Sequence, residues 1–148
     1  GLGGTAGSTL VCALVWARHF LVAHAGDSRC YRVDARGASR LTRDHSEAGR
    51  LANALGWPTD LVIELTPAEG APGSLDEDGV LLVCSDGLHG VLAEDNIHSA
   101  VLETRTVEDA CRRLVSLALD RGSTDNVSVA AVEVGHVHRR TQGLRTGL

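Results

Sequence analysis

The chain has 148 residues, of which 43% are apolar and 22% are charged, and its formal net charge at pH 7 is −5. This composition is typical of one globular domain and excludes a disordered chain. The negative charge argues against a broad nucleic-acid surface, which needs an excess of Arg and Lys on one face. We therefore expect no nucleic-acid partner.

The apolar runs and the cysteines predict a cytoplasmic protein without a membrane segment. The longest apolar runs, such as Val80 to Cys84, are far shorter than the roughly 18 residues that a membrane-spanning helix needs. The cysteines are widely spaced inside apolar runs, without a CxxC pair, and this pattern predicts buried free thiols. They are Cys12, Cys30, Cys84 and Cys111. The first residues have no charged region followed by an apolar core, so we expect no secretory signal there, and the missing initiator Met predicts a start inside a longer protein.

The first third of the chain predicts a β-meander. Two β-prone runs, Thr9 to Trp16 and Phe20 to Ala25, are separated by a short turn and predict a hairpin. A third strand is expected at Arg29 to Val33, and a return strand at Ser39 to Leu41. From Ser46 to Leu55 the apolar residues recur at helical spacing, which predicts a short helix closed by a glycine.

The second half predicts strands alternating with helices. Strands are expected at Leu61 to Thr66, at Val80 to Cys84 as the central strand, and at Val127 to Val134. Helices are expected at Ala93 to Glu103 and at Val107 to Arg121, the second opened by Thr106 as its cap and both packed as one pair. Residues 1–135 are interpreted as one domain, and residues 136–148, without an apolar period, as a disordered tail.

Three aspartates follow predicted strands or stand in turns beside small residues. They are Asp27 in GDSR, Asp86 in SDGL and Asp125 in TDN. A strand end is rigid and open to solvent, so carboxylates from several strands can converge there on one hard cation. Taken singly, each motif is more typical of an ordinary β-turn.

Four short segments stand in an order that resembles a known family. They are GDSR (26–29), LTRDHS (41–46), LLVCSDGL (81–88) and STDNVSV (123–129), preceded by GSTL at 7–10. In this order they are similar to the metal-dependent protein serine/threonine phosphatases of the protein phosphatase 2C type. The resemblance runs from about residue 3 to residue 134 and indicates the C-terminal portion of that family's domain.

The resemblance implies a fold and an activity. The fold would be α+β, a layered α-β-β-α sandwich of mainly antiparallel sheets flanked by helices, here with the N-terminal strands missing. The activity would be metal-dependent hydrolysis of phosphoserine and phosphothreonine in proteins by a water that bridges two metal ions. A phosphorylated protein would be the substrate, and a cognate protein kinase is an expected partner.

The resemblance also implies roles for individual residues. Asp86 and Asp125 would coordinate one Mn²⁺ or Mg²⁺ ion of a binuclear centre, and Asp27 would help to hold a third, weaker ion that shares Asp86. Asp44 and His45 match the family's Asp-His-Ser segment, where a structural role is favoured over a proton-carrying histidine. The segment after them, which contacts substrate in the family, looks shortened.

Several residues that the family uses have no counterpart in the sequence. They are an N-terminal Arg that grips phosphate, an acidic residue near it, and an Asp-Gly-x-Gly-Gly segment whose Asp bridges both ions. We therefore expect little or no phosphatase activity from these 148 residues alone. One alternative is a catalytically inactive regulatory or binding module for a kinase or sigma-factor partner. Another is an unrelated α+β ligand-binding domain whose aspartates only form turns.

Overall fold

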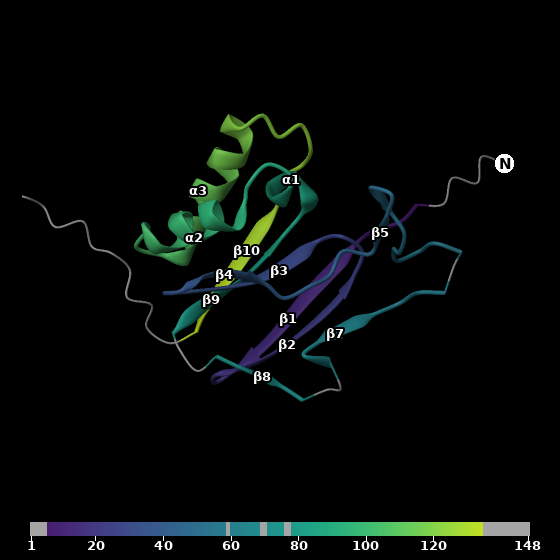
Figure 1. Ribbon diagram of the computed structural model, residues 1–148, viewed down its shortest axis with the longest axis horizontal. Coiled ribbons are helices and arrows are strands. Elements are labelled where there is room, and N and C mark those ends of the chain that lie inside the picture. Colours follow the sequence, from purple (N-terminus) through teal and green to yellow (C-terminus); the bar gives the residue numbers. More distant parts are fainter. Residues whose placement is uncertain (1–5, 59, 69–70, 76–77, 135–148) are drawn as a thin grey trace, which may run out of the picture.

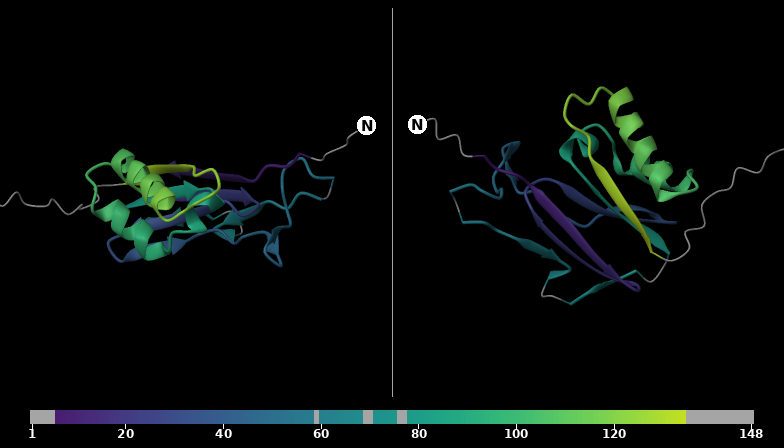
Figure 2. Two further views of the ribbon diagram at one scale, coloured as in Figure 1. Left: turned by 90° about the horizontal axis from the view of Figure 1, so that it is seen from above. Right: turned by 180° about the vertical axis from the view of Figure 1, so that it is seen from behind.

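Two antiparallel sheets lie face to face, and helices cover the outer face of one of them (Figures 1 and 2). This computed structural model describes residues 6–58, 60–68, 71–75 and 78–134. The predicted tail at residues 136–148 lies outside the described residues. Mainly antiparallel sheets with packed helices confirm the predicted fold class. Within the described ranges, however, the helices cover only the second sheet, so this part of the chain shows three layers.

The first sheet is built on the predicted hairpin. Strand β1 (Leu10–Trp16) pairs with β2 (His19–Ala25) from Leu10 opposite Ala25 to Trp16 opposite His19. The sheet has the order β1-β2-β7, and β2 also pairs with β8; the bounds are Glu64–Thr66 for β7 and Gly73–Ser74 for β8. The predicted strand at 61–66 is therefore shorter than expected, because only its last three residues pair with β2.

The second sheet has the order β10-β9-β3-β4. Its strands are β3 (Arg29–Asp34), β4 (Gly37–Arg40), β9 (Gly79–Cys84) and β10 (Val129–Val134). The apolar run that predicted a central strand is β9, which lies between β3 and β10 and is buried along nearly its whole length. This prediction is confirmed.

The helices follow β9 in the chain. They are α1 (Asp86–His89), α2 (Glu94–Leu102) and α3 (Val107–Asp120). The two predicted helices are confirmed as α2 and α3, with ends within one residue. As predicted, Thr106 caps α3, because its Oγ1 accepts the backbone N–H of Asp109 at 3.0 Å. The short helix α1 was not predicted, since a single turn offers too few residues for a periodic pattern.

The predicted helix at residues 46–55 is wrong. The chain instead forms a small hairpin of β5 (Ser46–Glu47) and β6 (Arg50–Leu51). Its two turn residues, Ala48 and Gly49, adopt φ of +49° and +74°. Two consecutive left-handed residues are the backbone of a tight hairpin turn and cannot continue a right-handed helix. The apolar spacing therefore did not report a helical face.

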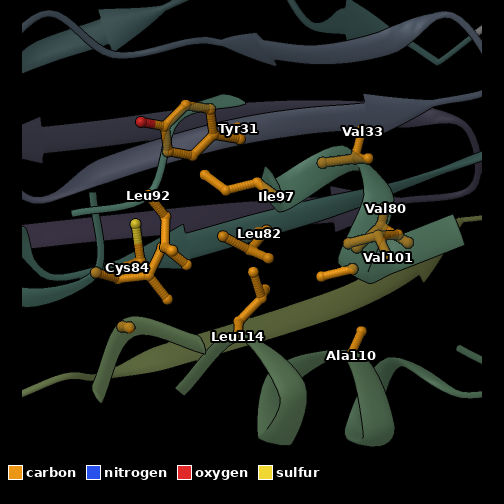
Figure 3. Packing of buried hydrophobic residues seen from close by; sticks show 13 residues of the cluster. Tyr31, Val33, Val80, Leu82, Cys84, Leu92, Ile97, Val101, Ala110 and Leu114 are labelled. Carbon is orange, nitrogen blue, oxygen red and sulfur yellow. The ribbon is translucent and has the colours of Figure 1, made fainter. Parts of the chain in front are cut away.

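Strands β3, β9 and β10 of the second sheet each contribute to two cores, one on either face. Alternate residues of β3 and β9 point to the helices, including Tyr31, Val33, Val80 and Leu82, which pack on Ile97 and Leu114 (Figure 3). The residues between them point to the first sheet, where Cys30 and Leu81 pack on Phe20 and Val22. This alternation is the period of two that a strand buried on both faces requires. Burial on both faces holds in place the strands that lead to the candidate site.

The outer face of the first sheet is apolar and open to solvent. Leu10, Leu14 and Trp16 on β1 and Leu65 on β7 are all exposed, with Leu14 the most exposed of them at 59%. No helix of the described residues covers this face (Figure 2). Large apolar side chains on one face of a sheet are normally buried, so this surface is unusual.

The cysteines only partly follow the prediction of buried thiols. Cys30 and Cys84 are buried, and burial raises the pKa of both thiols to about 12. Cys12 is exposed, because it lies on the open outer face of β1, and Cys111 is half-buried on α3. All four are free thiols. Among the described residues, no helix is long and apolar enough to cross a membrane.

Candidate functional site

The three predicted aspartates lie at one end of the second sheet. The end of β9 at Cys84 pairs with Arg29, the start of β3, and with Val129, the start of β10. Asp27 precedes β3, Asp86 follows β9 and Asp125 precedes β10. The antiparallel pairing therefore brings three segments, distant in sequence, to the same edge.

Asp86 and Asp125 line the same cavity, which has a volume of about 270 Å³. Two hydroxyl groups tie the segments that carry them. Ser85 Oγ donates to the Asn126 carbonyl at 2.9 Å, and Ser123 Oγ donates to the Gly87 carbonyl at 2.7 Å. A Cβ atom on Gly87 would lie only 2.5 Å from the Asn126 carbonyl oxygen, so the close approach requires glycine.

Asp27 lies close enough to Asp86 to feel its charge. Burial raises the pKa of the Asp27 carboxyl group, and the nearby negative charge of Asp86 raises it further. His89 Nε2 donates to the Asp27 carbonyl oxygen at 2.9 Å. Burial, with a further contribution from Arg29, lowers the pKa of His89, which favours the neutral ring at this position. Asp86 therefore shares a cavity with Asp125 and lies near enough to Asp27 to affect its pKa.

The donor set at this edge fits a hard divalent cation. Carboxylate oxygens are the ligands that Mg²⁺ and Mn²⁺ prefer. Two carboxylates whose charges repel are stabilised when a cation binds between them. The pKa of Asp27 is raised first by burial and then by the charge of Asp86, so some repulsion of this kind is present. With so few carboxylates, the described residues supply only part of a complete coordination shell.

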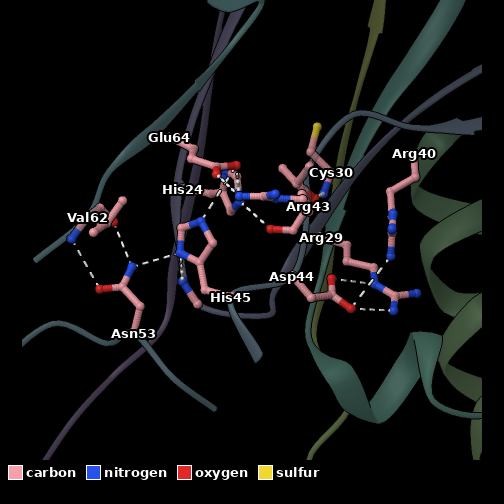
Figure 4. Close-up of polar contacts among 12 residues, drawn as sticks. His24, Arg29, Cys30, Arg40, Arg43, Asp44, His45, Asn53, Val62 and Glu64 are labelled. Atoms are coloured by element: carbon pink, nitrogen blue, oxygen red, sulfur yellow. Dashed lines mark hydrogen bonds and ion pairs between the residues drawn. The ribbon is translucent and has the colours of Figure 1, made fainter. Parts of the chain in front are cut away.

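Asp44 has a structural contact at the edge of this site. Its carboxylate accepts two hydrogen bonds from Arg29, from Nε at 2.9 Å and from Nη2 at 2.6 Å (Figure 4). These bonds lower the pKa of Asp44. Arg29 begins β3, two residues after Asp27, so this pair anchors the strand that leaves the candidate site. The contact agrees with the structural role expected for Asp44.

Asp44→Asn is expected to reduce stability at neutral pH and to flatten its loss in acid. The native pKa of Asp44 lies below the unfolded value of about 3.9, so its contribution is complete above that value and is lost as the pH falls through the native pKa. Charged hydrogen bonds of this kind contribute about 1.5–3 kcal/mol. Urea unfolding between pH 7 and pH 3 measures the difference. The exposed Asp120→Asn is the control, and equal curves for wild type and Asp44→Asn would contradict the assignment.

A second group of titratable side chains was not identified from the sequence. His24, His45 and Glu64 offer ligand atoms that all lie within 4.8 Å of one another (Figure 4). Glu64 Oε2 is 3.8 Å from His24 Nε2 and 3.6 Å from His45 Nε2, while Arg43 pairs with Glu64 Oε1 at 2.8 Å. The residues come from β2, from the loop after β4, and from β7, so no local spacing reveals them.

His45 itself is a hydrogen-bonded residue of the loop. Its backbone N–H donates to the Gly26 carbonyl at 3.0 Å, and its Nδ1 accepts the Gly26 N–H at 3.2 Å. The ring packs against that of His24, with centroids 4.7 Å apart and the ring planes tilted by 31°. Its side chain is only 8% exposed, which separates the ring from bulk water. These contacts agree with the structural role expected for His45 and not with a proton carrier.

Comparisons with known proteins identify one family. The family model described as Protein phosphatase 2C matches residues 3–57. The serine/threonine phosphatase stp of Listeria monocytogenes is 28% identical over 144 residues, which cover 86% of this chain and 56% of the relative. The probable protein phosphatase 2C 8 of Oryza sativa is 30% identical over 179 residues, with 93% of this chain and 44% of the relative covered.

Solved structures agree with these sequence relatives. The serine/threonine phosphatase Stp1 from Staphylococcus aureus matches with a TM-score of 0.76 and 27% identity, covering 88% of this chain and 57% of that one. A bacterial serine phosphatase matches with a TM-score of 0.77 and 27% identity, covering 87% and 58%. The chain thus spans about half the length of the relatives that it matches. Sequence and fold together show that the chain belongs to the protein phosphatase 2C family.

Proposed function

We propose that this chain is part of a protein serine/threonine phosphatase in which Asp86, Asp125 and Asp27 bind divalent cations, Mn²⁺ or Mg²⁺. The observation that carries the proposal is the convergence of three strand ends, which sets Asp86 and Asp125 on one cavity with Asp27 beside Asp86. The names of the relatives, serine/threonine phosphatases and protein phosphatases 2C, support the reaction.

The residues of this chain would position ions and phosphate rather than react themselves. When bound, a pair of divalent ions supplies an activated water and neutralises the charge of a phosphoryl group. Asp86, which shares a cavity with Asp125 and affects the pKa of Asp27, would be shared between two ions. The rigid end of β9 and the serine contacts around Gly87 would keep the backbone at Asp86 in place before any ion binds.

The substrate class follows from the same proposal. A phosphorylated serine or threonine in a protein would be hydrolysed, and the kinase that adds the phosphate would be the functional counterpart. A cytoplasmic location suits a chain that carries buried free thiols. Because few carboxylates are present at the site, the chain alone is expected to bind Mg²⁺ weakly and to show little or no turnover.

Calorimetric titration with Mn²⁺ tests the site directly. We expect the wild-type chain to bind, and Asp86→Asn and Asp125→Asn each to raise the dissociation constant about tenfold or more, because each removes a charged ligand. Asp95→Asn, at an exposed position in the first turn of α2, is the matched control. Unchanged binding by both site variants would exclude the proposed centre. A phosphomonoester assay with Mn²⁺ that gave turnover lost in Asp86→Ala would show that the chain alone is active.

A further inference from the structure

The Gly26-Asp27 turn is held by a pair of hydrogen bonds from one residue. Gly26 donates its N–H to His45 Nδ1 at 3.2 Å and accepts the His45 N–H on its carbonyl oxygen at 3.0 Å. On the other side of the turn, His89 Nε2 donates to the Asp27 carbonyl at 2.9 Å. The backbone at Asp27 is therefore fixed from both sides, by one histidine from the loop after β4 and by one from α1.

Asn53 determines which ring nitrogen of His45 carries the proton. Its Nδ2 donates to the Val62 carbonyl at 2.6 Å, and its Oδ1 accepts the Val62 N–H at 3.2 Å (Figure 4). The reversed amide would set like groups against each other at both contacts, so the orientation is assigned from these partners. In this orientation Nδ2 also donates to His45 Nδ1 at 2.7 Å.

His45 Nδ1 is therefore an acceptor, because two N–H donors, from Gly26 and from Asn53, point at it. A neutral imidazole with an acceptor at Nδ1 carries its hydrogen on Nε2. That Nε2 is buried and has no hydrogen-bond partner among the described residues, and it faces Glu64 Oε2 at 3.6 Å. The carboxylate of Glu64 thus lies opposite a buried N–H group.

The hydrogens on both Nε2 atoms also leave the His24, His45 and Glu64 group poorly arranged to bind a metal ion. His24 Nε2 lies 2.8 Å from the Arg43 carbonyl oxygen, which can only accept, so this nitrogen also carries a hydrogen. A histidine binds a metal through a nitrogen lone pair. The Nε2 atoms of His24 and His45 instead each carry a hydrogen, and both lie near the Glu64 carboxylate, which is an acceptor.

We propose that His45 is a positioning residue for Asp27, which through the acceptor at Nδ1 fixes the Gly26 N–H and with it the direction of the Asp27 carboxylate. This inference rests on the proposed function of Asp27 as a cation ligand. Asn53 and Glu64 orient the ring from its two nitrogens, so that the segment around β7 is connected to the candidate site through one histidine. The family resemblance supplied no such role for Asn53 or Glu64.

Two substitutions of His45 distinguish the effect of the Nδ1 acceptor from the effect of losing the ring. In His45→Asn the side-chain oxygen can occupy the place of Nδ1, whereas in His45→Gln the polar group reaches the place of Nε2 and no acceptor remains for Gly26. We expect His45→Asn to keep the wild-type Mn²⁺ affinity within about threefold and His45→Gln to lose about tenfold, the range that one hydrogen bond covers. Equal losses in the two variants would overturn the positioning role.

Amide hydrogen exchange gives a readout that does not depend on metal binding. In His45→Gln the Gly26 amide should exchange about tenfold faster than in wild type, while in His45→Asn it should stay close to wild type. The Leu82 amide in β9 reports global opening in each variant and is the internal reference. An unchanged Gly26 amide in His45→Gln would overturn the inference. Absence of Mn²⁺ binding in wild type would instead remove the proposed function, and the exchange rates would still decide whether His45 holds the turn.

Discussion

Leu114→Ala is expected to lower the free energy of unfolding by about 2–5 kcal/mol. Leu114 is fully buried on α3 and packs against Leu82 and its neighbours in the core between the helices and the second sheet (Figure 3). Truncation removes apolar contacts and leaves a cavity that the surrounding strands cannot fill, because β9 is held between two partners. Urea-induced unfolding followed by circular dichroism measures the loss.

Leu119→Ala is the matched control for this prediction. Leu119 lies on the same helix, undergoes the same chemical change, and is 56% exposed. Its replacement should change the free energy of unfolding by about 0.5 kcal/mol or less, with the better helix propensity of Ala acting in both variants. Similar losses for the two substitutions would contradict the packing of α3 described above.

Gly87→Ala is expected to damage stability and metal binding together. Its Cβ atom would lie 2.5 Å from the Asn126 carbonyl oxygen and 3.0 Å from the carbonyl carbon, so the backbone must move. Such overpacking costs about 1–3 kcal/mol. Because Gly87 is next to Asp86, and Asn126 is next to Asp125, the movement separates the two carboxylates. The affinity for Mn²⁺ should therefore fall together with the free energy of unfolding.

Val80→Ala separates these two effects. Val80 is fully buried at the start of β9, at the other end of the strand from Asp86. Its truncation should cost a comparable amount, about 1–3 kcal/mol, without moving either aspartate. Calorimetric titration of both variants at a temperature where they remain folded gives the comparison. A wild-type Mn²⁺ affinity in Gly87→Ala would show that the glycine contact does not set the distance between Asp86 and Asp125.

Helices and strands could be predicted where an apolar pattern is bounded by residues that typically begin or end such an element. The apolar run of β9 and the cap at Thr106 are examples, because each depends on neighbouring residues alone. The helix expected at 46–55 failed because the left-handed backbone at Ala48 is not encoded by apolar spacing. Cys12 was expected to be buried, but the face of β1 that carries it is open, and alternation cannot say which face of a sheet is covered.

The residues of the candidate site also include some that the sequence could predict and some that it could not. Asp27, Asp86 and Asp125 could be singled out because each stands beside a strand end and a small residue, and the pairing of β9 with β3 and β10 then brings the segments together. His24 and Glu64 could not be singled out. They become neighbours only when β7 pairs with β2, and His45 joins them from the loop after β4. Long-range contacts of this kind cannot be predicted from the local pattern of a single sequence.

The exposed leucines and tryptophan on β1 can be replaced by polar residues to improve the behaviour of samples for experiments. Side chains that are already in water contribute little to the core, so polar replacements such as Leu14→Lys should be tolerated. Without such replacements, the protein is expected to self-associate through this apolar surface in the concentrated samples that calorimetry and nuclear magnetic resonance need. A chain made more hydrophilic here could stay monodisperse while the aspartate edge, which lies between other strands, is left untouched.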